Sequence, residues 1–104
     1  MTFSIENADG WTIDRACVGK VVEKLCELVD MGRLDPVRTE IFAGSPMVLE
    51  MKKQPYVSVQ HGALNVLVGI TDGSDIITID EKRRYALYRL GSKDSLQWTG
   101  CVSK

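Results

Sequence analysis

The sequence lacks the residue patterns that mark metal, nucleotide and membrane proteins. It has one histidine and three cysteines without a CxxC pair, so neither a His-rich metal cluster nor a zinc site is predicted. Its nine glycines are scattered through turns and form no phosphate-binding loop of either familiar kind. No apolar run approaches the ~20 residues that span a bilayer. We therefore expect no cofactor, no bound metal and no membrane partner.

The cysteine count also bears on disulfides and on the cellular compartment. Because the number is odd, a disulfide framework is not predicted, and the thiols are expected to be small buried or half-buried hydrophobic groups. The first residues, Met-Thr-Phe-Ser-Ile-Glu, lack the basic segment followed by an apolar segment that marks a signal peptide. The sequence thus predicts a cytoplasmic protein.

Charge of neither sign is in excess. The net charge is −1, and 44% hydrophobic with 26% charged residues is ordinary for a globular protein, which argues against disorder. A length of 104 residues suits one domain over residues 1–104. Acidic residues outnumber basic ones in residues 1–31, whereas basic residues predominate in 82–104, so the chain is charge-dipolar along its length.

The stretch from Asp14 to Met31 has the only strongly helical periodicity in the chain. At 100° per residue its aliphatic side chains fall within an arc of roughly 120° and its charged side chains lie mainly opposite. The aliphatic residues are Val18, Val21, Val22, Leu25, Leu28 and Val29. Thr12 or Asp14 can cap the first turn, and Gly32 can end the helix in the left-handed conformation. The pattern predicts one amphipathic helix with a single buried face.

Alternation of apolar and polar residues predicts β-strands through most of the remaining chain. The expected strands are 2–6, 37–42, 47–52, 56–60, 63–70, 75–79, 85–90 and 96–102, with 63–70 central and turns at 61–62, 71–74 and 80–84. A helix is the alternative for 80–90, because these residues are good helix formers. Short connections favour antiparallel neighbours. The predicted class is α+β, with one amphipathic helix packed on a curved antiparallel meander sheet of six to seven strands that can curl toward a barrel.

Catalysis is the less favoured interpretation. Cys17 lies in or near the first helical turn, where the helix dipole favours a thiolate, but its one candidate base, His61, is expected at a hairpin tip. The paired carboxylates at 72 and 75, and at 80 and 81, fall in predicted turns, and turn formation accounts for them. The sequence therefore identifies no catalytic residue.

Apolar residues occur on both faces of several predicted strands, which is more than one helix can cover. Leu67 lies opposite its apolar neighbours, and so does Ile76. Either the sheet curls, or a second copy or another protein covers the remaining face. The candidate interface residues are Met47, Leu49 and Met51. The sequence thus predicts a small non-catalytic binding protein that acts as a homodimer or through a protein partner.

Aromatic and basic residues supply two alternative functions. The candidate binding surface comprises Tyr56, Arg83, Arg84, Tyr85, Tyr88, Arg89 and Trp98. Aromatic rings at the mouth of a curled sheet can line a pocket for a small molecule. Together with the arginines, the rings can stack the bases and hold the phosphates of single-stranded nucleic acid. The net charge of −1 disfavours nucleic acid as the partner.

Overall fold

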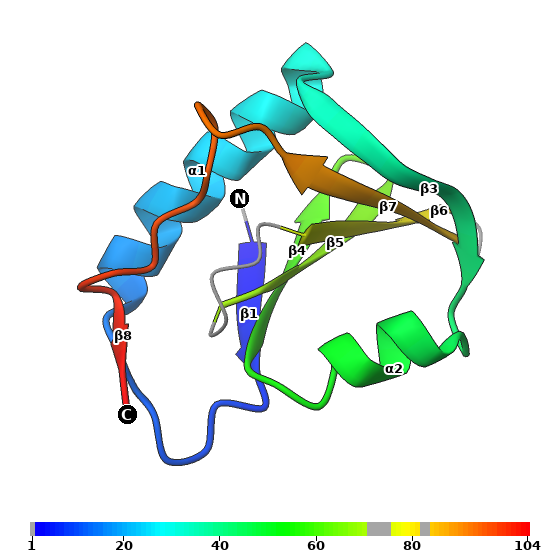
Figure 1. Cartoon of the computed structure of the whole chain (residues 1–104). Helices are drawn as coiled ribbons and strands as arrows, with labels where there is room; N and C mark the ends of the chain where they lie inside the picture. The colour runs from blue at the N-terminus through cyan, green and yellow to red at the C-terminus, as the bar shows by residue number, and fades with distance from the viewer. Residues whose placement is uncertain (1, 71–75, 82–83) are drawn as a thin grey trace.

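Two helices lie on opposite faces of one six-stranded antiparallel sheet (Figure 1). The computed structural model describes residues 2–70, 76–81 and 84–104. The strands of the sheet are β1 (Thr2–Glu6), β3 (Leu34–Phe42), β4 (Tyr56–His61), β5 (Leu64–Gly69), β6 (Ile76–Glu81) and β7 (Arg84–Leu90). Their order is β1-β4-β5-β6-β7-β3, so β4 to β7 form a meander and the sheet stays open with β1 and β3 as its edges. The predicted α+β class is confirmed.

The long helix α1 (Arg15–Met31) begins and ends where the sequence predicts. The Asp14 carboxylate accepts the backbone N–H groups of Ala16 and Cys17 at 3.1 and 3.2 Å. These groups have no partner within the helix, so the cap stabilises the first turn. Gly32 ends the helix with φ at 65°, a conformation that glycine adopts without steric cost.

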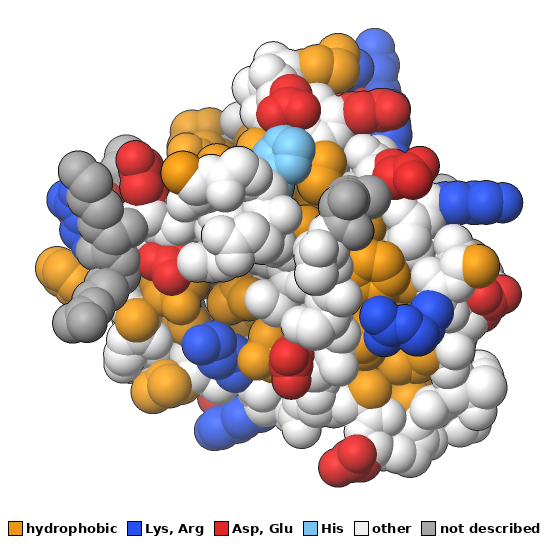
Figure 2. Space-filling view, turned by 180° about the vertical axis from the view of Figure 1, so that it is seen from behind, with side chains coloured by type: hydrophobic (Ala, Val, Ile, Leu, Met, Phe, Trp, Pro, Cys, Tyr) orange, Lys and Arg blue, Asp and Glu red, His pale blue; other side chains and the backbone are white. Residues whose placement is uncertain are grey.

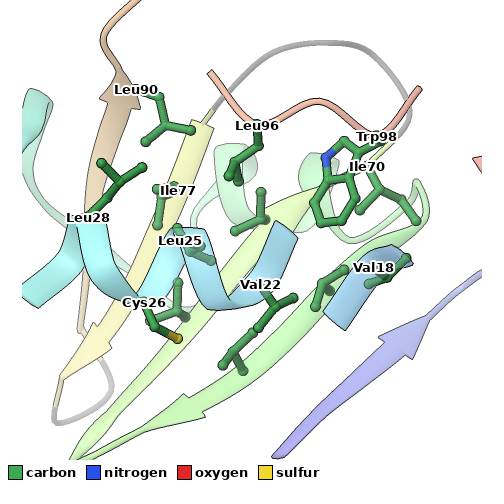
Figure 3. Packing of buried hydrophobic residues seen from close by; sticks show 14 of the residues in the cluster. Val18, Val22, Leu25, Cys26, Leu28, Ile70, Ile77, Leu90, Leu96 and Trp98 are labelled. Atoms are coloured by element: carbon green, nitrogen blue, oxygen red, sulfur yellow. The ribbon is translucent and has the colours of Figure 1, made fainter. Parts of the chain in front are cut away.

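The apolar face of α1 forms the main core with the sheet (Figure 3). Val18, Val22, Leu25 and Leu28 are fully buried, and they meet alternate residues of the inner strands, such as Val57, Val66 and Ile77. Burial of each aliphatic side chain stabilises the fold by roughly 1.5–3 kcal/mol, which outweighs the low helix propensity of the valines. The helix therefore forms because it packs against the sheet.

A second helix, α2 (Pro46–Met51), replaces the strand that the sequence predicted at 47–52. The Ser45 hydroxyl accepts the N–H of Val48 at 3.4 Å, and Pro46 occupies the first turn, where its missing N–H costs nothing. Helical geometry turns Val48 inward and leaves it 0% exposed, whereas Leu49 faces solvent. The prediction was wrong because a segment of six residues fits both periods.

The helix α2 also explains the apolar residues on the second face of the sheet. Val48 packs in a separate cluster with Leu67, Tyr85 and Leu87, and Ile76 contacts the edge of that cluster. From the sequence, we expected that the sheet curls or that a second copy or another protein covers this face. Instead, a segment of the same chain covers it, so surplus apolar strand faces no longer argue for a dimer.

The C-terminal segment is mainly irregular, and the strand predicted at 96–102 is wrong. Only β8 (Val102–Ser103) is regular, and it pairs with β2 (Thr12–Ile13) beside the start of α1. Leu96 and Trp98 share an environment as expected, but they are buried in the main core. This segment therefore completes the core with side chains and adds no strand to the large sheet.

A disulfide joins Cys17 in the first turn of α1 to Cys101, 84 residues further along the chain. The odd number of cysteines had argued against a disulfide framework, but it requires only that one cysteine, Cys26, remains outside the pair. Closure of so long a loop restricts the unfolded chain, which stabilises the fold by about 2–5 kcal/mol. The structure thus corrects the expectation that all the cysteines are thiols.

The remaining predicted strands and hairpins agree closely with the structure. In the β4–β5 hairpin His61 pairs with Leu64, so the turn comprises Gly62 and Ala63, one residue later than predicted. Both β6 and β7 are strands, so the alternative helix over 80–90 is wrong. The turn predicted at 71–74 lies outside the described residues. The strand 63–70 was expected to be central, and β5 is indeed paired on both sides.

Candidate functional site

The large hydrophobic side chains that remain exposed on the described part of the chain all belong to one stretch of sequence. They are Met31, Val37, Phe42, Met47 and Leu49. Phe42 at the end of β3 is 69% exposed, and Leu49 and Met47 on the outer side of α2 are 51% and 39% exposed. We call Phe42, Met47 and Leu49 the β3–α2 patch. A single exposed phenylalanine is ordinary, but a surface that covered Phe42 would gain the free energy of removing its ring from water.

Local geometry explains why the patch forms. β3 ends at Phe42, the chain turns, and the N–H of Ser45 donates to the carbonyl of Phe42 at 2.8 Å. Ser45 then caps α2, so Phe42 and the first turn of the helix are held close together. Because Val48 faces the sheet, Met47 and Leu49 lie about 100° to either side of it around the helix, and both are exposed on opposite flanks of α2. Two of the three predicted interface residues, Met47 and Leu49, are therefore exposed.

The third predicted interface residue, Met51, lies in a groove between α2 and the sheet. The groove has a volume of about 270 Å³ and is lined by Met47, Glu50, Met51, Gln54, Gly69, Ile76 and Leu87. The Thr78 hydroxyl donates to the Met51 sulfur at 3.5 Å, which helps to fix this side chain. The groove adjoins the β3–α2 patch through Met47, and its walls are chiefly aliphatic. Such a space suits an apolar side chain better than a polar ligand.

Two ion pairs lie near the patch, and each joins a basic to an acidic side chain. Arg84 contacts Glu40 at 2.7 Å, and Lys53 contacts Glu50 at 3.1 Å. All four side chains are largely exposed, so each pair contributes little to the stability of the fold. Figure 2 shows the same character on the reverse of the molecule, where hydrophobic side chains alternate with charges of both signs. The surroundings of the patch are thus close to neutral.

The predicted aromatic and basic surface is divided between the two sides of the sheet. Tyr88 packs against the α1 core, and Trp98 is 7% exposed within it. Tyr56 and Tyr85 belong to the α2 cluster. Arg89 is exposed, and Arg83 lies outside the described residues. The buried rings of Tyr85 and Trp98 cannot stack on bases in this conformation.

Part of that predicted surface does converge, at the end of the β6–β7 hairpin. Arg84, Tyr85 and Tyr88 line a hollow of about 290 Å³ together with Glu40 and other residues. Burial raises the pKa of the Tyr85 phenol, and the charges of nearby groups, Asp80 first, raise it further. Arg84, the arginine among the described residues that line the hollow, is already paired with Glu40.

The cysteine chemistry considered from the sequence is not supported. Cys17 is held in the disulfide, so it cannot be a nucleophilic thiolate in this state. His61 contacts Asp30 at 2.7 Å, and both line a groove of about 460 Å³ that also includes Cys26. Burial raises the pKa of the Cys26 thiol, and Asp30 raises it further. A thiol with a raised pKa stays protonated at neutral pH and is a poor nucleophile.

The described residues contain neither a group of side chains placed to bind a metal ion nor a helix that could span a membrane. They contain no group of three or more His, Cys, Asp or Glu side chains arranged to hold a metal ion. None of the helices in the described part of the chain is long and apolar enough to cross a membrane.

The fold and surface define a small α+β protein with an open sheet, a helix on each face and exposed apolar side chains where β3 leads into α2. Comparisons with known proteins found no matching family model, no matching curated protein and no matching solved structure. The function must therefore be argued from the surface of this chain alone.

Proposed function

We propose that the protein is a non-catalytic interaction module that self-associates through the β3–α2 patch. The observation that carries this proposal is that Phe42, Met47 and Leu49 are all exposed within the short stretch that joins β3 to α2 and begins that helix. Aromatic residues and methionine are enriched in protein interfaces, and methionine adapts its shape to a partner. Covering the patch removes its apolar area from water, which is the driving force for association.

The charges beside the patch favour a second copy as the partner. In a two-fold dimer each surface meets itself, so a patch surrounded by charges of one sign would repel its own copy. Here Glu40 with Arg84 and Glu50 with Lys53 balance one another, and the net charge of the chain is −1. The surface is therefore compatible with a copy of itself and gives no electrostatic preference for a strongly basic or acidic partner.

Side chains, and not the backbone of the β3 edge, are proposed to make the contact. Pro36 lies within β3 and has no N–H to donate to an added strand. The pairing of β3 with β7 also shifts register between Pro36 and Ile41, which distorts the edge. Proline and bulges are features that protect edge strands against further pairing. At this edge of the molecule, the apolar side chains of the β3–α2 patch are thus more available for contact with a partner than the backbone of β3.

The substitution Leu49→Asp is expected to weaken dimerisation by about 100-fold, because an unpaired charge would enter an apolar contact. The fold should tolerate the change, since Leu49 lies on the outer side of α2. Light scattering coupled to size-exclusion chromatography over a concentration series measures the effect. Lys24→Asp places the same side chain on the exposed side of α1 and is the matched control. A wild-type protein that stays monomeric at the highest concentration would reject the proposal.

The disulfide bears on where such a module would work. The Cys17–Cys101 bond argues against the cytoplasmic location predicted from the sequence, because disulfides persist mainly in oxidising compartments. We infer that the form described here, with α1 and the C-terminal segment covalently joined, is the form present under oxidising conditions.

A further inference from the structure

The C-terminal strap, which we define as residues 91–104, runs from the end of β7 alongside α1 to the N-terminal end of that helix (Figure 1). The two-residue strand β8 is its only regular element. The disulfide fixes its far end, because Cys101 is bonded to Cys17 of α1. At the same end, the N–H of Asp14 donates to the carbonyl of Cys101 at 2.8 Å.

The strap covers an apolar part of the main core. Leu96 and Trp98 point inward from the strap, toward Ile70 and α1 (Figure 3). Without the strap, Val18 and Ile70, now almost fully buried, would lose their cover on this side. An ion pair between Arg33 and Asp94, at 3.1 Å, ties the near end of the strap to the chain beyond α1.

We propose that the Cys17–Cys101 bond is a redox latch on this strap, so that reduction opens the strap while α1 and the sheet stay folded. The inner strands β4 to β7 are each hydrogen-bonded to a neighbour on both sides. With the other described residues, the strap makes the β2–β8 pairing and a few isolated backbone bonds. Segments with few backbone hydrogen bonds open locally more readily than strands paired on both sides, and here the burial of Leu96 and Trp98 and the covalent bond both oppose that opening. The device is independent of the β3–α2 patch.

The chemistry of opening is thiol–disulfide exchange with a dithiol reductant. Cys17 is partly exposed whereas Cys101 is buried, so the thiolate of the reductant approaches on the Cys17 side. Attack on the Cys17 sulfur forms a mixed disulfide and releases Cys101 as a thiolate, which takes up a proton. The second thiol of the reductant then displaces Cys17. Two electrons and two protons reach the protein, and the reductant leaves as a cyclic disulfide.

Limited trypsin digestion of the oxidised and reduced full-length chain tests the latch. Lys93 is an exposed residue of the strap, and because trypsin binds its substrate in an extended form, opening of the strap is expected to accelerate cleavage after Lys93. Because cleavage tracks the population of the open form, reduction should accelerate it by on the order of 30-fold. Cleavage at Lys53, between α2 and β4, should not change. Far-UV circular dichroism of the reduced protein should keep the helix and sheet signal.

Two cysteine variants separate opening of the strap from other effects of the reductant. Cys17→Ala combined with Cys101→Ala should behave as the reduced protein under all conditions. Cys26→Ala keeps the disulfide and should respond to reductant like the wild type. If the cleavage rate at Lys93 is unchanged in a sample whose three cysteines are all confirmed to be reduced thiols, the latch is overturned. Loss of the circular dichroism signal on reduction would also overturn it, because the bond would then support the whole fold.

Discussion

Val48→Asp is expected to unfold the protein, or to lower its free energy of unfolding by about 4 kcal/mol or more. Val48 is fully buried, and α2 holds it against Leu67, Tyr85 and Leu87. A carboxylate at this position would lose its hydration among apolar side chains, and the exposed Lys52 ammonium, which lies 6.0 Å from the centre of the Tyr85 ring, would offset only part of that loss. Since small domains are stable by only about 5–15 kcal/mol, one such change removes a large share of the total.

The neighbouring substitution Leu49→Asp is the control for this prediction, because it introduces the same group one residue away on the exposed side of α2. Its effect on the stability of the monomer should stay within about 0.5 kcal/mol. Urea denaturation of both variants, compared at a concentration where dimers are absent, gives the two values. If both substitutions lowered the free energy of unfolding equally, α2 could not have Val48 facing the core and Leu49 facing solvent.

Trp98→Ala is expected to lower the free energy of unfolding by about 3–5 kcal/mol, because it leaves a large cavity between the C-terminal strap and α1. The sequence had suggested that Trp98 is part of a binding surface, where its loss would weaken binding and leave stability unchanged. Thermal unfolding followed by circular dichroism distinguishes the two. Gln97→Ala removes the exposed side chain next to it and should have almost no effect. A Trp98→Ala protein as stable as the wild type would place this ring outside the core.

The helix α1 and the strands β4 to β7 were predictable because their signals are local. Asp14 and Gly32 mark the ends of α1, and its apolar residues recur at helical spacing over about three turns. Strands β4 and β5 alternate regularly on the face toward α1, and glycine in the turn connects them. In each case the residues that fix the element lie within the element itself.

The helix α2 was missed because six residues are too few to separate a period of 2 from a period of 3.6. Met47, Leu49 and Met51 alternate with other residues as a strand would, but Val48 and Met51 also lie on one side of a helix. The signal that distinguishes the two is at its start, where Ser45 followed by Pro46 is a strong helix beginning. With α2 covering the second face of the sheet, the exposed apolar side chains of α2, and not uncovered strand faces, support self-association.

The disulfide and the strap could not be predicted because both depend on contacts between distant parts of the chain. Cys17 and Cys101 come together only after β8 pairs with β2 beside the start of α1. Likewise, nothing near Leu96 or Trp98 in the sequence shows that α1 and Ile70 will enclose them. Of the residues of the proposed interface, the sequence analysis named Met47 and Leu49, which are exposed, whereas it assigned Phe42, the most exposed of the three, to a strand without a role.

Methionine methyl NMR over a concentration series tests the proposed self-association most directly. The chain has four methionines; Met47 belongs to the β3–α2 patch, Met51 to the adjoining groove, and the exposed Met31 ends α1. We predict that the methyl signal of Met47 shifts or broadens as the concentration rises, that Met51 follows to a smaller extent, and that Met31 does not move. A Met47 signal that stays constant at all concentrations, or a shift confined to Met31, would contradict the assignment of the β3–α2 patch as the interface.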